Sequence, residues 1–164
     1  MDDFIFANVE EVLGRLAEDL RENYKSALLQ SDRVASRKLY QSVRTQVVFS
    51  MNSWDVKMSL EDYWKYVEND TLPHWPPRDK ILQWILIKPV IPRPDARGKI
   101  PTPQQLSYLI SRKIARFGTE GSHDLERTVE GMLPRYMEEL SQALQKDATA
   151  YVHNLMPWIH GGAK

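Results

Sequence analysis

The chain has 164 residues, with 22 lysines and arginines, 22 aspartates and glutamates, and no cysteine. Its length fits one domain with a sizeable core. The zero net charge excludes the global attraction to nucleic acid that a basic protein has, and the missing cysteine excludes disulfides, thiol catalysis and cysteine-based zinc sites. The acidic start has no apolar signal core, and no run approaches the roughly 18 apolar residues needed to span a bilayer. We therefore expect a soluble chain without a secretion signal.

The first predicted elements are a long helix and a β-hairpin. Residues 4–29 carry apolar side chains at spacings of three and four, as one face of an amphipathic helix requires. Residues 43–50 and 54–60 alternate apolar and polar side chains and are separated by a turn at Asn52-Ser53. They predict two antiparallel strands. The side chains expected on the packed face are Val47, Phe49, Val56 and Met58.

The stretch YWKYVENDTLPHWPPRDKILQWI, residues 63–85, concentrates aromatic side chains beside prolines. Residues 63–67 predict a short irregular element, and a helix is expected to begin at Pro77 and to stop at Pro89. Its buried face would hold Ile81, Leu82, Trp84, Ile85 and Leu86.

The aromatic side chains of this stretch admit two interpretations, sealing a core or recognising a partner. For Trp64, Tyr66 and Trp84 we favour packing of the hairpin against the helices. Trp75, between His74 and two prolines, is instead expected to be an exposed anchor.

Five prolines from Pro89 to Pro103, together with Arg93, Arg97 and Lys99, predict a stiff, exposed loop over residues 89–101. We expect this loop to contact neighbouring subunits, although a solvated connector is the alternative. The residues expected at a subunit or partner interface are Trp75, Arg93, Arg97 and Lys99.

Two more helices are predicted after the loop. Thr102, Pro103 and Gln105 form the signature of a capping box, and Gly118 ends that helix. Its expected buried face holds Leu106, Leu109, Ile110, Ile114 and Phe117. The last helix is expected to begin with Ser122 as its cap and to kink or restart at Pro134. Its apolar stripe holds Leu125, Val129, Met132, Leu133, Tyr136, Met137, Leu140, Leu144, Ala148, Tyr151, Val152 and Leu155.

These elements predict an α+β fold in which an antiparallel hairpin or small sheet packs on three or more helices. Residues 1–156 would form a single domain and residues 157–164 a flexible tail.

Charge is unevenly distributed along the chain. Residues 1–31 carry seven acids and three bases, residues 78–116 nine bases and two acids, and residues 120–147 seven acids and three bases. Solvated helix faces would explain each block, but blocks of opposite sign also suit contacts between identical subunits.

No motif for catalysis, metal binding or cofactor binding occurs in the sequence. The four histidines do not have the spacing of metal ligands. Paired catalytic carboxylates must point at the same bond of a substrate, whereas the side chains of the adjacent pairs Glu61-Asp62 and Glu138-Glu139 point in different directions. We therefore expect no enzymatic activity, metal or cofactor. The alternative function is a nucleic-acid-binding module that uses the basic middle segment. Its residues would be Arg93, Arg97, Lys99, Arg112, Lys113 and Arg116.

Short motifs in a fixed order resemble a known family. Ser36, Leu39, Ser42 and Val43 precede the first strand in a pattern of the form small-x-x-L-x-x-S-(I/V), and a segment similar to Y-x-x-Y-V-E-x-G-T follows the hairpin. That segment holds Tyr63, Tyr66, Val67, Glu68 and Thr71, with Asn69-Asp70 in place of a residue and glycine. The sequences LPHWPPRDKILQWI and LSYLISRKIARFGTEG resemble two helices of the family's longer members.

The chain thereby resembles the tail-completion and neck proteins of tailed double-stranded DNA bacteriophages, a family that includes head-tail joining proteins and tail terminators. The resemblance implies a structural virion subunit that forms a homo-oligomeric ring, commonly of six copies, at the head-tail junction. It implies contacts with adjacent neck or connector proteins and the tail tube, and a channel through which genomic DNA passes without sequence-specific binding. The zero net charge agrees with a channel that does not bind the DNA phosphates tightly.

Overall fold

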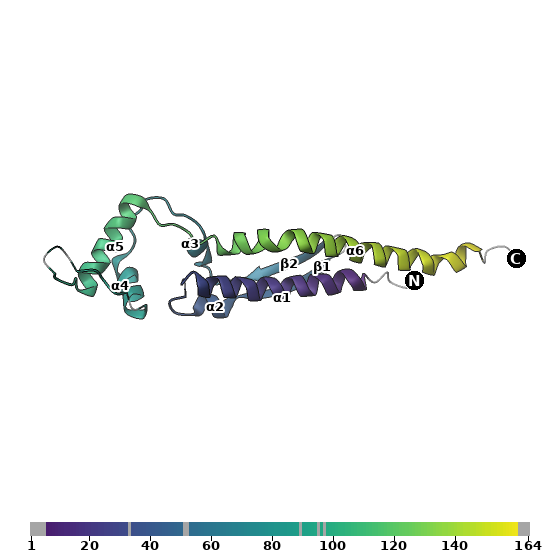
Figure 1. Cartoon of the computed structure of the whole chain (residues 1–164), viewed down its shortest axis with the longest axis horizontal. Helices are drawn as coiled ribbons and strands as arrows, with labels where there is room; N and C mark the ends of the chain where they lie inside the picture. The colour runs from purple at the N-terminus through teal and green to yellow at the C-terminus, as the bar shows by residue number, and fades with distance from the viewer. Residues whose placement is uncertain are drawn as a thin grey trace. The chain divides into compact units, whose positions relative to one another are not determined.

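The computed structural model of the chain describes residues 6–32, 34–50, 53–88, 90–94, 96 and 98–160. Its fold is α+β, as predicted (Figure 1). In chain order the elements are α1 (Ala7–Gln30), α2 (Lys38–Ser42), β1 (Arg44–Ser50), β2 (Ser53–Ser59), α3 (Trp64–Glu68), α4 (Arg78–Ile87), α5 (Pro103–Phe117) and α6 (Asp124–His160).

The chain divides into two compact units, where its length suggested one domain. Unit 1 comprises Met1–Tyr24, Arg44–Ser59 and Glu126–Lys164, and unit 2 comprises Lys25–Val43 and Leu60–Leu125. Unit 1 therefore contains most of α1, the hairpin and nearly all of α6, whereas unit 2 contains α2 to α5.

Unit 1 is built on α1 and α6, which run antiparallel. Hydrogen bonds or ion pairs join Asn8 to Asp147, Arg15 to Glu139, and Asp19 to Tyr136. Residue numbers rise along one helix as they fall along the other, which is the pairing of two antiparallel helices lying side by side (Figure 1). The described core of unit 1 is formed by Val9, Val12, Leu13, Tyr136 and Ala143.

The β-hairpin packs on this core as predicted for part of its inner face. Val47 pairs with Val56, and both pack against the core. Trp54 joins them and meets the ring of Phe6 edge to face, with 4.5 Å between ring centres. The alternation of strand side chains is therefore the one that the sequence predicts.

The outer end of the hairpin differs from the prediction. Met58 is half-buried, but Phe49 is 47% exposed. Alternation puts Phe49 on the same face as Val47, yet its cross-strand partner Trp54 makes the contact with Phe6. Phe49 therefore contributes less apolar packing than the sequence pattern indicates.

A buried carboxylate of α6 caps the first turn of α1. Asp147 is 4% exposed and accepts hydrogen bonds from the backbone N–H groups of Asn8 and Val9, at 3.2 and 3.0 Å, and from the Asn8 side chain at 2.6 Å. Burial alone would raise the pKa of Asp147, but these hydrogen bonds outweigh it, so the pKa lies below its ordinary value. A tertiary contact thus satisfies amides that the helix cannot satisfy itself.

The short helices of unit 2 differ in detail from the sequence prediction. Pro77 occupies the N-cap of α4 and not its first helical position, and α4 ends at Ile87, just before Pro89, which lies outside the described residues. Of the predicted buried face of α4, only Ile85 is fully buried, and Leu86 is exposed.

Helix α5 begins and ends as the sequence predicts. The Thr102 side chain accepts from the backbone of Gln105, whose side chain accepts from the backbone of Thr102, and Pro103 opens the helix. Gly118 ends it with a φ of 72°, a conformation that favours glycine.

The buried face of α5 is not the predicted one. Ser107 and Ser111 are its fully buried side chains, whereas Leu109 is 49% and Phe117 73% exposed. Helix α4 packs against α5, and small serine side chains allow two helices to approach closely. The larger apolar face of α5 is thereby left outside this contact.

Helix α6 is continuous from Asp124 to His160, so it does not restart at Pro134, and it extends into the predicted tail. Residues 161–164 of that tail lie outside the described part of the chain. Within the described residues, no helix is long and apolar enough to cross a membrane.

We predict that Val56→Asp lowers the free energy of unfolding by about 3 kcal/mol, because it places a charge against the core without a partner. Urea unfolding followed by circular dichroism measures the change. Gln46→Asp is the control, since Gln46 is exposed and lies opposite Lys57. Equal stability of the two variants would show that the inner face is assigned incorrectly.

We predict that Asp147→Asn destabilises the chain at pH 7 by about 1–2 kcal/mol. The folded pKa is lowered, so the carboxylate stabilises the fold above its unfolded pKa of about 4, and this contribution is lost as pH falls through the folded pKa. The stability difference between wild type and variant should therefore shrink on acidification below about pH 4. Glu130→Gln, at an exposed position of the same helix, is the control; a difference independent of pH would contradict the assignment.

Candidate interaction surfaces

The two compact units carry opposite charge. By sequence, unit 2 holds 14 lysines and arginines against nine acids, a net charge of +5, whereas unit 1 holds eight against 13, a net charge of −5. The neutral chain is therefore a pair of oppositely charged units. Such a distribution suits electrostatic attraction between an acidic unit of one copy and a basic unit of another.

Trp75 lies in an exposed aromatic and basic cluster on unit 2. Its side chain is 55% exposed, as expected for an anchor, and its ring centre lies 6.2 Å from that of Tyr108 on α5. The guanidinium of Arg78 lies over the same tyrosine, 5.5 Å from the ring centre. The sequence predicts Trp75 as an exposed residue but carries no signal for its contact with Tyr108 and Arg78, because about 30 residues separate Tyr108 from the other two.

The proline-rich loop is exposed over most of its described residues. Arg93 and Lys99 are exposed, as is the apolar pair Ile91 and Ile100. Arg97, the remaining predicted interface residue, lies outside the described residues. The structure therefore does not show the four predicted residues as one site. The described part of the loop presents both positive charge and apolar surface.

The three aromatic side chains that were expected to pack in a core differ in how far they are buried. Trp64 is half-buried, but Tyr66 and Trp84 are exposed. In the five-residue helix α3, Glu68 is the buried side chain, and this orientation turns Tyr66 outward. The packing interpretation is therefore wrong for Tyr66.

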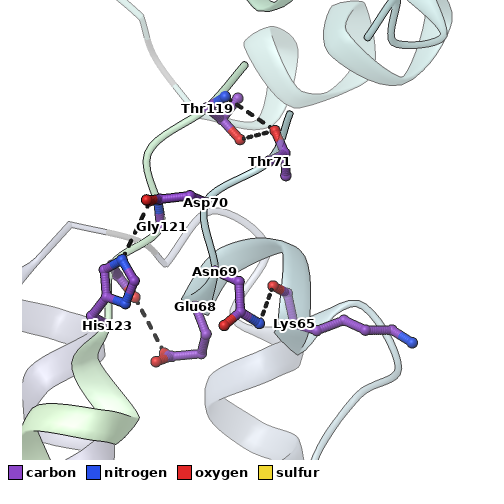
Figure 2. Close-up of polar contacts among 9 residues, drawn as sticks. Lys65, Glu68, Asn69, Asp70, Thr71, Thr119, Gly121 and His123 are labelled. Atoms are coloured by element: carbon purple, nitrogen blue, oxygen red, sulfur yellow. Dashed lines mark hydrogen bonds and ion pairs between the residues drawn. The ribbon is translucent and has the colours of Figure 1, made fainter. Parts of the chain in front are cut away.

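A polar junction, formed by residues 68–71 and 119–125, connects the end of α3 to the start of α6 (Figure 2). Glu68, which is 4% exposed, accepts from the backbone N–H of Leu125 at 2.8 Å and from the Ser122 hydroxyl at 3.2 Å. Glu68 thus caps α6, whereas Ser122, the residue predicted as the cap, donates to Glu68.

The rest of the junction pairs two extended segments. Thr71 and Thr119 bond to each other through their backbones and share a hydroxyl contact of 2.7 Å. The carboxylate of Asp70 accepts from the Gly121 N–H at 2.8 Å and lies 3.3 Å from His123 Nε2 (Figure 2). The Gly121 hydrogen bond, followed by that of His123, lowers the pKa of Asp70.

The glycines of the junction are required by close backbone approach. A Cβ at Gly118 would collide with the backbone of Thr71, and one at Gly121 with the backbone of Glu68 and Asn69. By contrast, a Cβ at Gly131 of α6 meets nothing within 4 Å. Glu68 and Thr71, which belong to the motif after the hairpin, therefore act together with two glycines that the motif does not include.

No group of three acidic or histidine side chains suited to a metal ion occurs in the described part of the chain. The described surfaces expose apolar, aromatic and charged side chains, and the polar contacts of the junction fix the backbone. A scan against protein-family models and searches of curated proteins and solved structures found no match to the chain.

We predict that Gly121→Ala destabilises the chain by about 2–3 kcal/mol, because the added methyl group forces the two segments of the junction apart. Gly131→Ala is the matched control and should stabilise the chain by up to about 1 kcal/mol through helix propensity. Thermal unfolding measures both, and hydrogen exchange should locate the loss of protection at residues 119–125. Unchanged exchange there in the Gly121 variant would refute the role of the junction.

Proposed function

We propose that the chain is a structural virion protein of a tailed double-stranded DNA bacteriophage. It would form a ring of identical copies at the head-tail junction, as a tail terminator, tail-completion or neck protein, around the DNA channel. The observation that carries the self-association is the division into a unit of charge −5 and a unit of charge +5. Attraction between unlike units of successive copies gives a heterologous contact, which closes into a ring under cyclic symmetry.

Exposed apolar side chains on both units support assembly. Unit 2 exposes Leu86, Ile91 and Phe117, and unit 1 exposes Leu133 and Met137. A chain that presents so many large apolar side chains on several elements is suited to burying them against other protein. The placement at a phage head-tail junction rests on the motif resemblance, and two residues of that motif, Glu68 and Thr71, make hydrogen bonds that hold the junction together.

The proposed partners follow from the same placement. The ring would contact the neck or connector on one side and the tail tube on the other, and its exposed loop over residues 89–101 would serve one of these contacts or the contact with the next copy. Genomic DNA would pass through the ring without being gripped, since the chain as a whole has no net charge.

A second candidate function is nucleic-acid binding by unit 2. The cluster of Trp75, Tyr108 and Arg78 favours it, because exposed aromatic rings beside cations can stack bases and pair with phosphates. Binding of this kind weakens steeply with added salt. Titration of the purified chain with a fluorescent oligonucleotide at several salt concentrations distinguishes this function from ring formation.

We predict that the purified chain forms a closed homo-oligomer of one defined size as its concentration rises. Because opposite charges contribute to the contact, added salt should weaken the association. Sedimentation velocity and native mass spectrometry measure the copy number, and electron microscopy should show rings. A chain that stays monomeric at its highest soluble concentration, and is present as one copy per virion, would contradict the proposed function.

A further inference from the structure

Helix α5 presents an apolar face outward. Leu109 and Phe117 are exposed on it, and Leu106 and Ile110 are half-buried. The spacing of these four residues places them within one sector of the helix, whose centre points away from the buried Ser107 and Ser111. The exposed side chains of Lys113 and Arg116 accompany this face. At 100° per residue, Lys113 lies between Leu109 and Leu106 on this side of the helix, and Arg116 lies at its edge. The outer face of α5, defined by these residues, is therefore apolar with positive charge toward its C-terminal end.

Helix α6 presents a second apolar surface. Its contact with α1 uses Tyr136, Ala143 and Asp147, whereas a separate row of apolar side chains, repeating at spacings of three and four, is partly exposed. This outer stripe of α6 comprises Leu133, Met137, Leu144, Tyr151 and Leu155. Glu130, which is exposed, borders the stripe near its start.

We propose that the outer face of α5 in one copy packs on the outer stripe of α6 in a second copy. This inference rests on the proposed self-association and names the surfaces that form the contact. Rows with helical spacing on both sides suit packing of one helix against another. The apolar side chains would be buried together, while Lys113 and Arg116 at the C-terminal end of the α5 face meet Glu130 beside the α6 stripe.

The charges also select the partner and the orientation. Pairing α5 with α5 would bring Lys113 and Arg116 against themselves in a parallel pair, or against the uncharged first turns of the other helix in an antiparallel pair. Pairing α6 with α6 would likewise oppose Glu130 to itself or place it away from Lys113 and Arg116. The basic residues lie near the end of α5, and Glu130 lies near the start of α6. Their approach therefore requires antiparallel helices, in which the helix dipoles also attract.

Lengths agree with a partial overlap. At 1.5 Å per residue, α5 with 15 residues is about 22 Å long, and the outer stripe from Leu133 to Leu155 extends over about 33 Å. One α5 thus covers about the first two thirds of the stripe, which contain Leu133 and Met137 and lie next to Glu130. The remaining third, around Tyr151 and Leu155, stays accessible to another protein.

The natural absence of cysteine makes a cross-linking test direct. Leu109→Cys and Met137→Cys would be introduced into chains that carry tags of different size, mixed at a concentration that supports oligomers, and oxidised. We expect a disulfide-linked pair that contains one chain of each size. Leu109→Cys mixed with Gln142→Cys is the control, because Gln142 lies about 140° around α6 from Met137.

Charge reversal provides a second measurement. Lys113→Glu with Arg116→Glu should weaken self-association at least tenfold, and Glu130→Lys should weaken it as well. Combining all three substitutions in one chain should restore most of the self-association, because the charges on both sides of the contact are then reversed. Circular dichroism confirms that these exposed substitutions leave the fold intact.

The outcomes separate this contact from the proposed function. An oligomer that forms no more Leu109–Met137 cross-link than the Gln142 control overturns the contact and leaves the ring standing. A cross-link found only in a Leu109→Cys, Met137→Cys double variant, within one chain, also overturns it. A strictly monomeric chain overturns both proposals, whereas the mixed cross-link with charge rescue supports the contact.

Discussion

Carboxylates from distant positions cap both long helices of the chain, and the remaining structure depends on these two contacts. Asp147 accepts from the first turn of α1, and Glu68 accepts from the first turn of α6. Each buried anion meets amides that lack a partner within their own helix, and the helix dipole strengthens the attraction. The first contact fixes the register of α1 on α6, and the second fixes where α6 begins.

The packing within each unit leaves apolar side chains of α5 and α6 exposed, which is consistent with binding to other protein. The serines of α5 occupy its buried side, so its leucines and Phe117 remain outside, and α6 uses a narrow part of its surface for α1. Apolar area left uncovered on a folded chain favours contacts with other protein. The separation of acidic from basic residues into two units would orient such contacts, because unlike charges attract and like charges repel.

Features that depend on neighbouring residues were predictable from the sequence, and features that depend on distant ones were not. Alternation predicted the hairpin, and three adjacent signals predicted the Thr102 cap, because both are local. Amphipathicity identified the apolar face of α5 but could not tell whether that face meets its own chain or another. The Asp147 and Glu68 caps join residues separated by 138 and 57 positions, and periodicity carries no signal for such pairs.

The order of segments in unit 1 has a consequence for folding during synthesis. Unit 2 is complete once Leu125 has been made, whereas unit 1 needs Glu126 onward to cover α1 and the hairpin. The chain is synthesised from its N-terminus. More than a hundred residues must therefore be added after α1 before α6 can cover the apolar side of α1. The same late segment carries the outer stripe of α6. A nascent chain therefore completes the apolar core of unit 1 and presents the outer stripe of α6 in the same step, so unfinished chains lack both.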